Sequence, residues 1–92
     1  MKGYLLWLAL ESLDRQKIIV DDWHQIGRAL LNEGYPCEVW DEWSKDLPWY
    51  RAGLCETCWE EFKRHVNWGC ANTIFRMAMD RGWKFSNNVE EE

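Results

Sequence analysis

CETCWEEFKRHVNWGC, residues 55–70, is the stretch on which the interpretation of the fold depends. Two cysteines separated by two residues, then a histidine and a third cysteine, are the ligand types of a Cys3His zinc site. The same stretch also carries apolar side chains at helical spacing, namely Cys55, Cys58, Trp59, Phe62 and Val66. The run WEEFKRHV after the cysteine pair is typical of a helix rather than of a zinc-binding turn. We therefore expect a helix over residues 52–66 whose cysteines are small buried hydrophobic residues.

Zinc binding by Cys55, Cys58, His65 and Cys70 stays open as the less favoured alternative. A redox pair of Cys55 and Cys58 is a further alternative, and the favoured interpretation requires no cofactor. His24 and His65 lie among charged neighbours on helix faces that we expect to be solvated. The sequence contains no glycine-rich phosphate loop and no motif that places a histidine beside a nucleophile, so it does not predict an enzyme.

Four other segments show helical periodicity, and none shows the alternation of a strand. The expected helices cover residues 4–13, a segment capped by Asp21 or Asp22 that ends at Gly34, residues 38–44, and a segment from Asn72 or Thr73 to Gly82. In the first helix we expect Leu5, Leu8, Ala9 and Leu13 to face the core. The sequence thus predicts an all-α fold: a compact bundle of about five short helices in one domain, residues 1–85, followed by a mobile acidic tail, residues 86–92.

Composition narrows the possible functions. A chain of 92 residues forms one domain with a small core, and eight tryptophans can supply much of the buried area. The net charge is −5, and without the three terminal glutamates thirteen acidic residues face eleven basic ones. Whole-chain charge therefore does not favour avid nucleic-acid binding.

The sequence has no signal peptide and no apolar run of the ~18 residues that a membrane span needs, so we expect a cytoplasmic protein with reduced cysteines.

Five motifs occur in an order that resembles a known family. They are ALESLD, DDWHQIGRAL, VWDEWS, the spacing C-x-x-x-W-x-x-F, and TIFRMAMDRGW. Together they resemble the primase C-terminal type 2 domain over about residues 8–84. This helical domain occurs in phage and plasmid primases and primase–helicases, between the primase and helicase domains.

The resemblance can be followed residue by residue. The matching positions are Trp23, Gly27, Ala29 and Leu30 of the second helix, Trp40, Trp43 and Ser44 of the third, Cys55, Trp59 and Phe62 of the fourth, and Thr73, Ile74, Phe75, Ala78, Gly82 and Trp83 at the end. It implies that the five matched tryptophans are core residues. It also implies a module without its own catalytic centre that engages a template or primer strand in replication initiation. Two features depart from the family: no primase or helicase accompanies the domain, and GCANTIF replaces the usual glycine-threonine entry to the last helix.

Two groups of residues are candidates for binding. The nucleic-acid-binding candidates are basic residues in the last third of the folded chain: Lys63, Arg64, Arg76, Arg81 and Lys84. If they converge, they can dock phosphates of single-stranded DNA or a primer–template while a tryptophan stacks on a base. The protein-partner candidates are the tryptophans outside the family pattern, Trp7, Trp49 and Trp68. For both groups the alternative is a purely structural role, as solvated charges or as covers of a small core.

Two functions therefore compete. The first is a nucleic-acid-binding accessory module of replication. The second is a phage-encoded inhibitor of a host defence nuclease, of the anti-CRISPR type, that binds a Cas or other host protein through exposed tryptophans and an acidic surface. A third hypothesis is that the chain is a piece of a longer primase.

Overall fold

The computed structural model describes residues 2–64 and 71–83, and these residues form helices without any strand. The elements are α1 (Lys2–Ser12), the 3-10 helix η1 (Arg15–Lys17), α2 (Val20–Asn32), α3 (Cys37–Ser44), α4 (Leu54–Arg64) and α5 (Ala71–Asp80). The predicted all-α class and the five α-helices are confirmed. No helix in the described ranges has the length and apolarity that a bilayer crossing requires.

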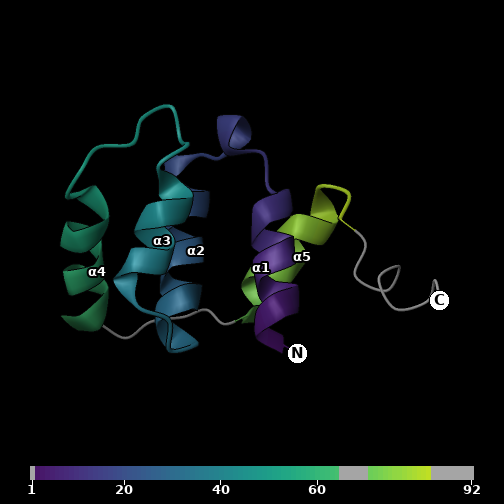
Figure 1. Ribbon diagram of the computed structural model, residues 1–92, viewed down its shortest axis with the longest axis horizontal. Helices are drawn as coiled ribbons and strands as arrows, with labels where there is room; N and C mark the ends of the chain where they lie inside the picture. Colours follow the sequence, from purple (N-terminus) through teal and green to yellow (C-terminus); the bar gives the residue numbers. More distant parts are fainter. Residues whose placement is uncertain (1, 65–70, 84–92) are drawn as a thin grey trace.

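Helix α2 is the centre of the arrangement, since it packs against α3, α4 and α5. Helix α1 packs on α5, and α3 packs on α4. Figure 1 shows the consequence: α4 lies at one end of the molecule, α1 and α5 lie at the other, and the α2–α3 pair separates them. Residues of α4 and α5 are therefore displayed on different parts of the surface.

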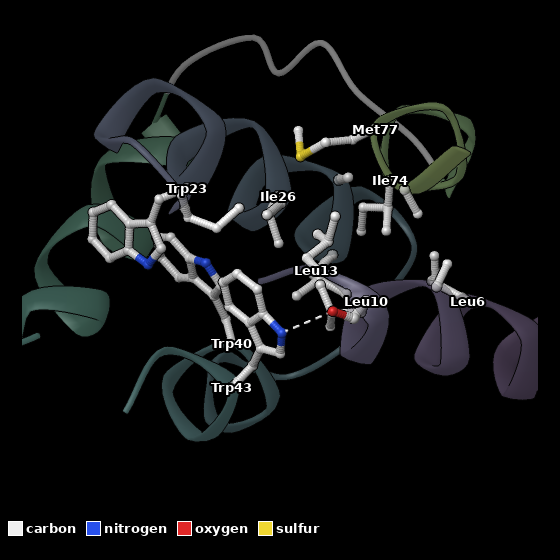
Figure 2. Packing of buried hydrophobic residues seen from close by; sticks show 14 of the residues in the cluster. Leu6, Leu10, Leu13, Trp23, Ile26, Trp40, Trp43, Ile74 and Met77 are labelled. Atoms are coloured by element: carbon white, nitrogen blue, oxygen red, sulfur yellow. Dashed lines mark hydrogen bonds between the residues drawn. The ribbon is translucent and has the colours of Figure 1, made fainter. Parts of the chain in front are cut away.

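The core is built around stacked indoles of α2 and α3. Trp23 and Trp40 stack with their ring centroids 4.5 Å apart, and Trp59 of α4 lies 5.7 Å from Trp40. Trp43 is buried beside them and donates its indole N–H to the Leu10 carbonyl at 3.1 Å, which joins α3 to α1 (Figure 2). Apolar side chains of α1, of Leu13 just after it, of α2 and of α5 extend this core: Leu6, Ala9, Leu10, Leu13, Ile26, Ala29, Leu30, Ile74, Met77 and Ala78.

Ser44 is the one buried polar side chain in the described part of the chain. Its hydroxyl accepts the indole N–H of Trp23 at 2.9 Å and donates to the Trp40 carbonyl at 2.7 Å. Trp40 and Ser44 of the VWDEWS motif thus form a hydrogen-bonded core unit with Trp23, because the serine hydroxyl bonds both to the Trp23 indole and to the backbone of its own helix.

Gly27 allows this packing. A Cβ atom on Gly27 would lie 2.5 to 2.8 Å from three ring atoms of Trp40, closer than carbon atoms approach in proteins. The glycine therefore lets the α2 backbone rest against the indole face. This contact gives a physical reason for the glycine in DDWHQIGRAL.

Several helix boundaries differ from the predictions. Helix α2 begins at Val20 with Ile19 as its N-cap, and Asp22 lies inside the first turn, where its carboxylate accepts the Ile19 N–H at 3.4 Å. Helix α4 begins at Leu54 rather than at residue 52, because Gly53 before it adopts a φ of +87°, which is not helical. Gly34 ends α2 as expected, with a φ of +89°.

The core-facing side of α1 also differs. Leu6 and Leu10 are buried together with Ala9 and Leu13, whereas Leu5 and Leu8 are half-buried. The reason is that α1 is apolar on all sides, so its periodicity does not select one face. The predicted tail, residues 86–92, lies outside the described residues.

Candidate functional site

The predicted basic cluster is divided by the fold. Lys63 and Arg64 lie at the end of α4, where they pair with Glu60 at 3.2 Å and Glu61 at 3.3 Å. Arg76 and Arg81 belong to α5 and its C-terminal turn, on the other side of the α2–α3 pair (Figure 1). Lys84 lies outside the described residues. The four described residues therefore form two separate pairs rather than one surface.

The pair on α5 lies in a hollow of about 610 Å³ between α2 and α5. We call this the α2–α5 hollow and define it by its lining residues: Asp22, Gln25, Thr73, Arg76, Met77, Asp80 and Arg81. It combines two guanidinium groups, two carboxylates, an amide and a hydroxyl group, and the thioether of Met77. Such a lining can hold an anionic group beside a flat apolar one.

Two of the lining residues are joined across the hollow. Arg81 donates to the Asp22 carboxylate at 3.0 Å and to the Met77 carbonyl at 3.4 Å. Asp22 thereby both supports the start of α2 and orients a guanidinium of the last turn. The sequence could not show this pair, because 59 residues separate its members.

The electrostatics of the α2–α5 hollow are mixed. Two arginines face two aspartates, and Asp22 already partly neutralises Arg81. Arg76 is exposed and has no ion pair among residues 2–64 and 71–83, so its guanidinium is the cation most available to a phosphate. The hollow can accept one or two phosphates, but it is not a strongly basic groove.

The tryptophans differ in their placement. Trp7 on α1 is 38% exposed, whereas Trp49 is half-buried and packs edge-to-face on Trp23 at 5.3 Å. Trp68 lies outside the described residues. Among the matched tryptophans Trp23, Trp40, Trp43 and Trp59 are buried as expected, but Trp83 is half-buried and stacks on Phe75 at 6.0 Å. Trp83 closes the edge of the core instead of filling it.

The cysteines of the opening stretch point to different surroundings. Cys55 is buried in the core, whereas Cys58 is half-buried, with its sulfur 3.9 Å from His24 Nε2. Burial raises the pKa of the Cys55 thiol to about 12, although a hydrogen bond with Ser44 acts in the opposite direction. Both are free thiols. The described residues hold no group of three His, Cys, Asp or Glu side chains that could bind a metal ion, and His65 and Cys70 lie outside those residues.

His24 was predicted to be solvated, but its side chain is half-buried. Its ring is half-buried between Trp23, at 5.2 Å, and Phe62, at 5.9 Å. Burial lowers the pKa of His24 below 6.5, Arg28 lowers it further, and Asp21 opposes the shift. The burial of His24 could not be predicted from its charged neighbours in the sequence, because the residues that cover it belong to α4, a distant part of the chain.

We expect the pKa of His24 to make stability depend on pH. The folded pKa lies below the unfolded value of 6.5, so the unfolded chain binds the proton more readily. The contribution of neutral His24 is therefore present above about pH 6.5 and is lost as the pH falls below it. Urea unfolding at about pH 7.5 and at about pH 5 measures how far the free energy of unfolding falls between these two pH values. This decrease should be smaller for His24→Gln than for the wild type. Equal losses in the two proteins would contradict the burial of His24.

The comparisons with known proteins concern most of the chain. The family model described as Primase C terminal 2 (PriCT-2) matches residues 8–78, which are 71 of the 92 residues. No curated protein and no solved structure matches the chain. The matched segment contains all of α2, α3 and α4 and most of α5, including Arg76 of the α2–α5 hollow.

Proposed function

The chain belongs to the primase C-terminal 2 family, and we propose that it is a non-catalytic helical module that contacts single-stranded DNA or a primer–template strand during replication initiation in the cytoplasm. The observation that carries the proposal is the α2–α5 hollow, where exposed Arg76 and the oriented guanidinium of Arg81 line one surface. Lys63 and Arg64 have no part in this contact, because they lie on the opposite side of the molecule (Figure 1).

In the proposed contact a backbone phosphate binds the Arg76 guanidinium, which can donate two parallel hydrogen bonds. A neighbouring phosphate approaches Arg81 from the side not occupied by Asp22. The Gln25 amide donates one hydrogen bond to Asp21 at 3.1 Å, and its carbonyl oxygen and second N–H can contact a sugar or base edge. Asp22 and Asp80 limit the attraction, so the contact is weak and selects a strand by shape as well as charge.

The charge balance predicts a shallow dependence of binding on salt. Each neutralised phosphate of a single strand contributes a slope of about −0.7 in log K against log salt. Two phosphates give a slope of roughly −1.4. A groove that used all five predicted basic residues would give a slope of roughly −3.5.

Fluorescence anisotropy with a labelled oligothymidylate at several low salt concentrations tests the proposal. We expect Arg76→Ala to weaken binding several-fold and to reduce the size of the salt slope by about 0.7. Lys63→Ala is the matched control, since it removes one positive charge from an exposed position on α4, and it should bind like the wild type. Absence of binding at the lowest salt, or an equal loss in both variants, would contradict the proposal.

Inhibition of a host defence nuclease is the second candidate function. It is favoured by exposed Trp7, which shares an apolar hollow with Glu38 and Glu42, because nucleases present basic surfaces to nucleic acids. Cleavage by a CRISPR–Cas nuclease in the presence of the protein tests this candidate. Inhibition that Trp7→Ala abolishes and Arg76→Ala retains supports it, whereas the reverse pattern shows that the protein only sequesters DNA.

A further inference from the structure

A second hollow, of about 620 Å³, lies between α1 and α3. We call it the Trp7 hollow, and its lining residues are Trp7, Tyr35, Glu38, Val39 and Glu42. Three of them are apolar or aromatic and two are acidic. It shares no residue with the α2–α5 hollow, so its role is independent of the proposed DNA contact.

Trp7 does not belong to the core-facing side of α1. That side consists of Leu6, Ala9 and Leu10, all almost fully buried, whereas Trp7 is 38% exposed. A tryptophan can bury about 150–250 Å² in a contact, and tryptophan is enriched among the residues that contribute most to binding energy. Trp7 is therefore suited to contact a ligand in the hollow.

The two glutamates restrict the chemistry of that ligand. Glu38 is exposed and has no ion pair among the described residues, and Glu42 pairs with Lys45 at 3.3 Å in an exposed position. An exposed pair of this kind is weak, so a cation from a ligand can replace Lys45. DNA phosphates are repelled by both carboxylates.

Charge also excludes two other occupants. A second copy of the chain docked on the same surface would place Glu38 and Glu42 against the same glutamates. The terminal segment of this chain ends in three glutamates and would be repelled in the same way. A ligand that suits both the apolar side chains and the two glutamates of the hollow carries an apolar side chain next to lysine or arginine. An arginine of this ligand could also lie over the Trp7 ring.

We propose that the Trp7 hollow binds a short basic segment of a protein partner, with an apolar side chain of the segment against Trp7 and Val39 and its lysine or arginine side chains paired with Glu38 and Glu42. The size of the hollow suits a few side chains, so the contact is of the weak, exchanging class. This proposal does not depend on the second candidate function, because the partner need not be a nuclease.

Two fluorescein-labelled peptides of about 12 residues test the proposal. One carries leucines flanked by lysines and arginines, and the other carries the same leucines flanked by glutamates. We expect the basic peptide to bind the wild type and the acidic peptide not to bind. Glu38→Lys, a surface change that leaves the core intact, should weaken the basic peptide at least several-fold.

Trp7→Ala should weaken the basic peptide at least tenfold. Its circular dichroism spectrum and melting curve establish that the variant is folded. Met79→Ala is the matched control, since it removes another exposed apolar side chain, 45% exposed on α5, and should bind like the wild type. No binding of the basic peptide, or unchanged binding by both Trp7→Ala and Glu38→Lys, would overturn the proposal.

Discussion

Replacement of Gly27 by alanine should lower the free energy of unfolding by about 3 kcal/mol, at the upper end of the usual cost of overpacking. The new methyl group would lie 2.5 Å from a ring atom of Trp40, which is fully buried and stacked on Trp23. The ring cannot move aside, because Trp59 and Phe62 pack against it as well. The gain of about 1 kcal/mol from the better helix propensity of alanine offsets only part of the clash.

For a domain of this size a loss of 3 kcal/mol corresponds to a decrease in melting temperature of roughly 12–24 °C. The double variant Gly27→Ala/Trp40→Leu is the control, since a smaller side chain at position 40 makes room for the methyl group. It should lose at least 1 kcal/mol less than the sum of the two single variants. A Gly27→Ala protein as stable as the wild type would contradict the close packing of α2 on Trp40.

Ser44→Ala should lower the free energy of unfolding by about 2 kcal/mol. The substitution leaves the buried indole N–H of Trp23 without the acceptor that it has at 2.9 Å. It also removes the bond from the hydroxyl to the Trp40 carbonyl at 2.7 Å. An unsatisfied buried donor is more costly than an average hydrogen bond is favourable, because the group loses its contact with water without compensation.

Ser12→Ala is the matched control for Ser44→Ala. Ser12 also donates to a carbonyl of its own helix, that of Ala9 at 2.6 Å, but it lies exposed at the end of α1. Its replacement should change stability by less than about 0.5 kcal/mol. Chemical denaturation of both variants gives the comparison. Equal effects at the two positions would show that Ser44 does not hold a core hydrogen-bond network.

The helices could be predicted from the sequence because their periodicity is strong and their ends carry local signals. Apolar spacing in α4 located the helix, and Gly34 located the end of α2. The buried positions of Trp23, Trp40 and Trp43 followed from the family resemblance. The orientation of α1 could not be predicted, because apolar residues surround the helix and only packing against α5 selects a side.

Less of the candidate site could be predicted from the sequence, because the site depends on contacts between distant segments. Lys63 and Arg76 are near in sequence, yet their helices pack on different sides of α2 (Figure 1). Asp22 and Arg81 are distant in sequence, yet they form one ion pair. Local patterns identify which residues can bind a phosphate, but only the fold determines which of them share a surface.

The most direct test of the proposed function is a map of the DNA contact by nuclear magnetic resonance. Oligothymidylate is added to labelled protein, and changes in backbone amide shifts are followed along α2, α4 and α5. We expect the largest changes around Gln25, Thr73 and Arg76, with little change at Lys63 in α4 and Glu38 in α3. Changes confined to α4, or no change at the highest DNA concentration, would contradict a nucleic-acid contact in the α2–α5 hollow.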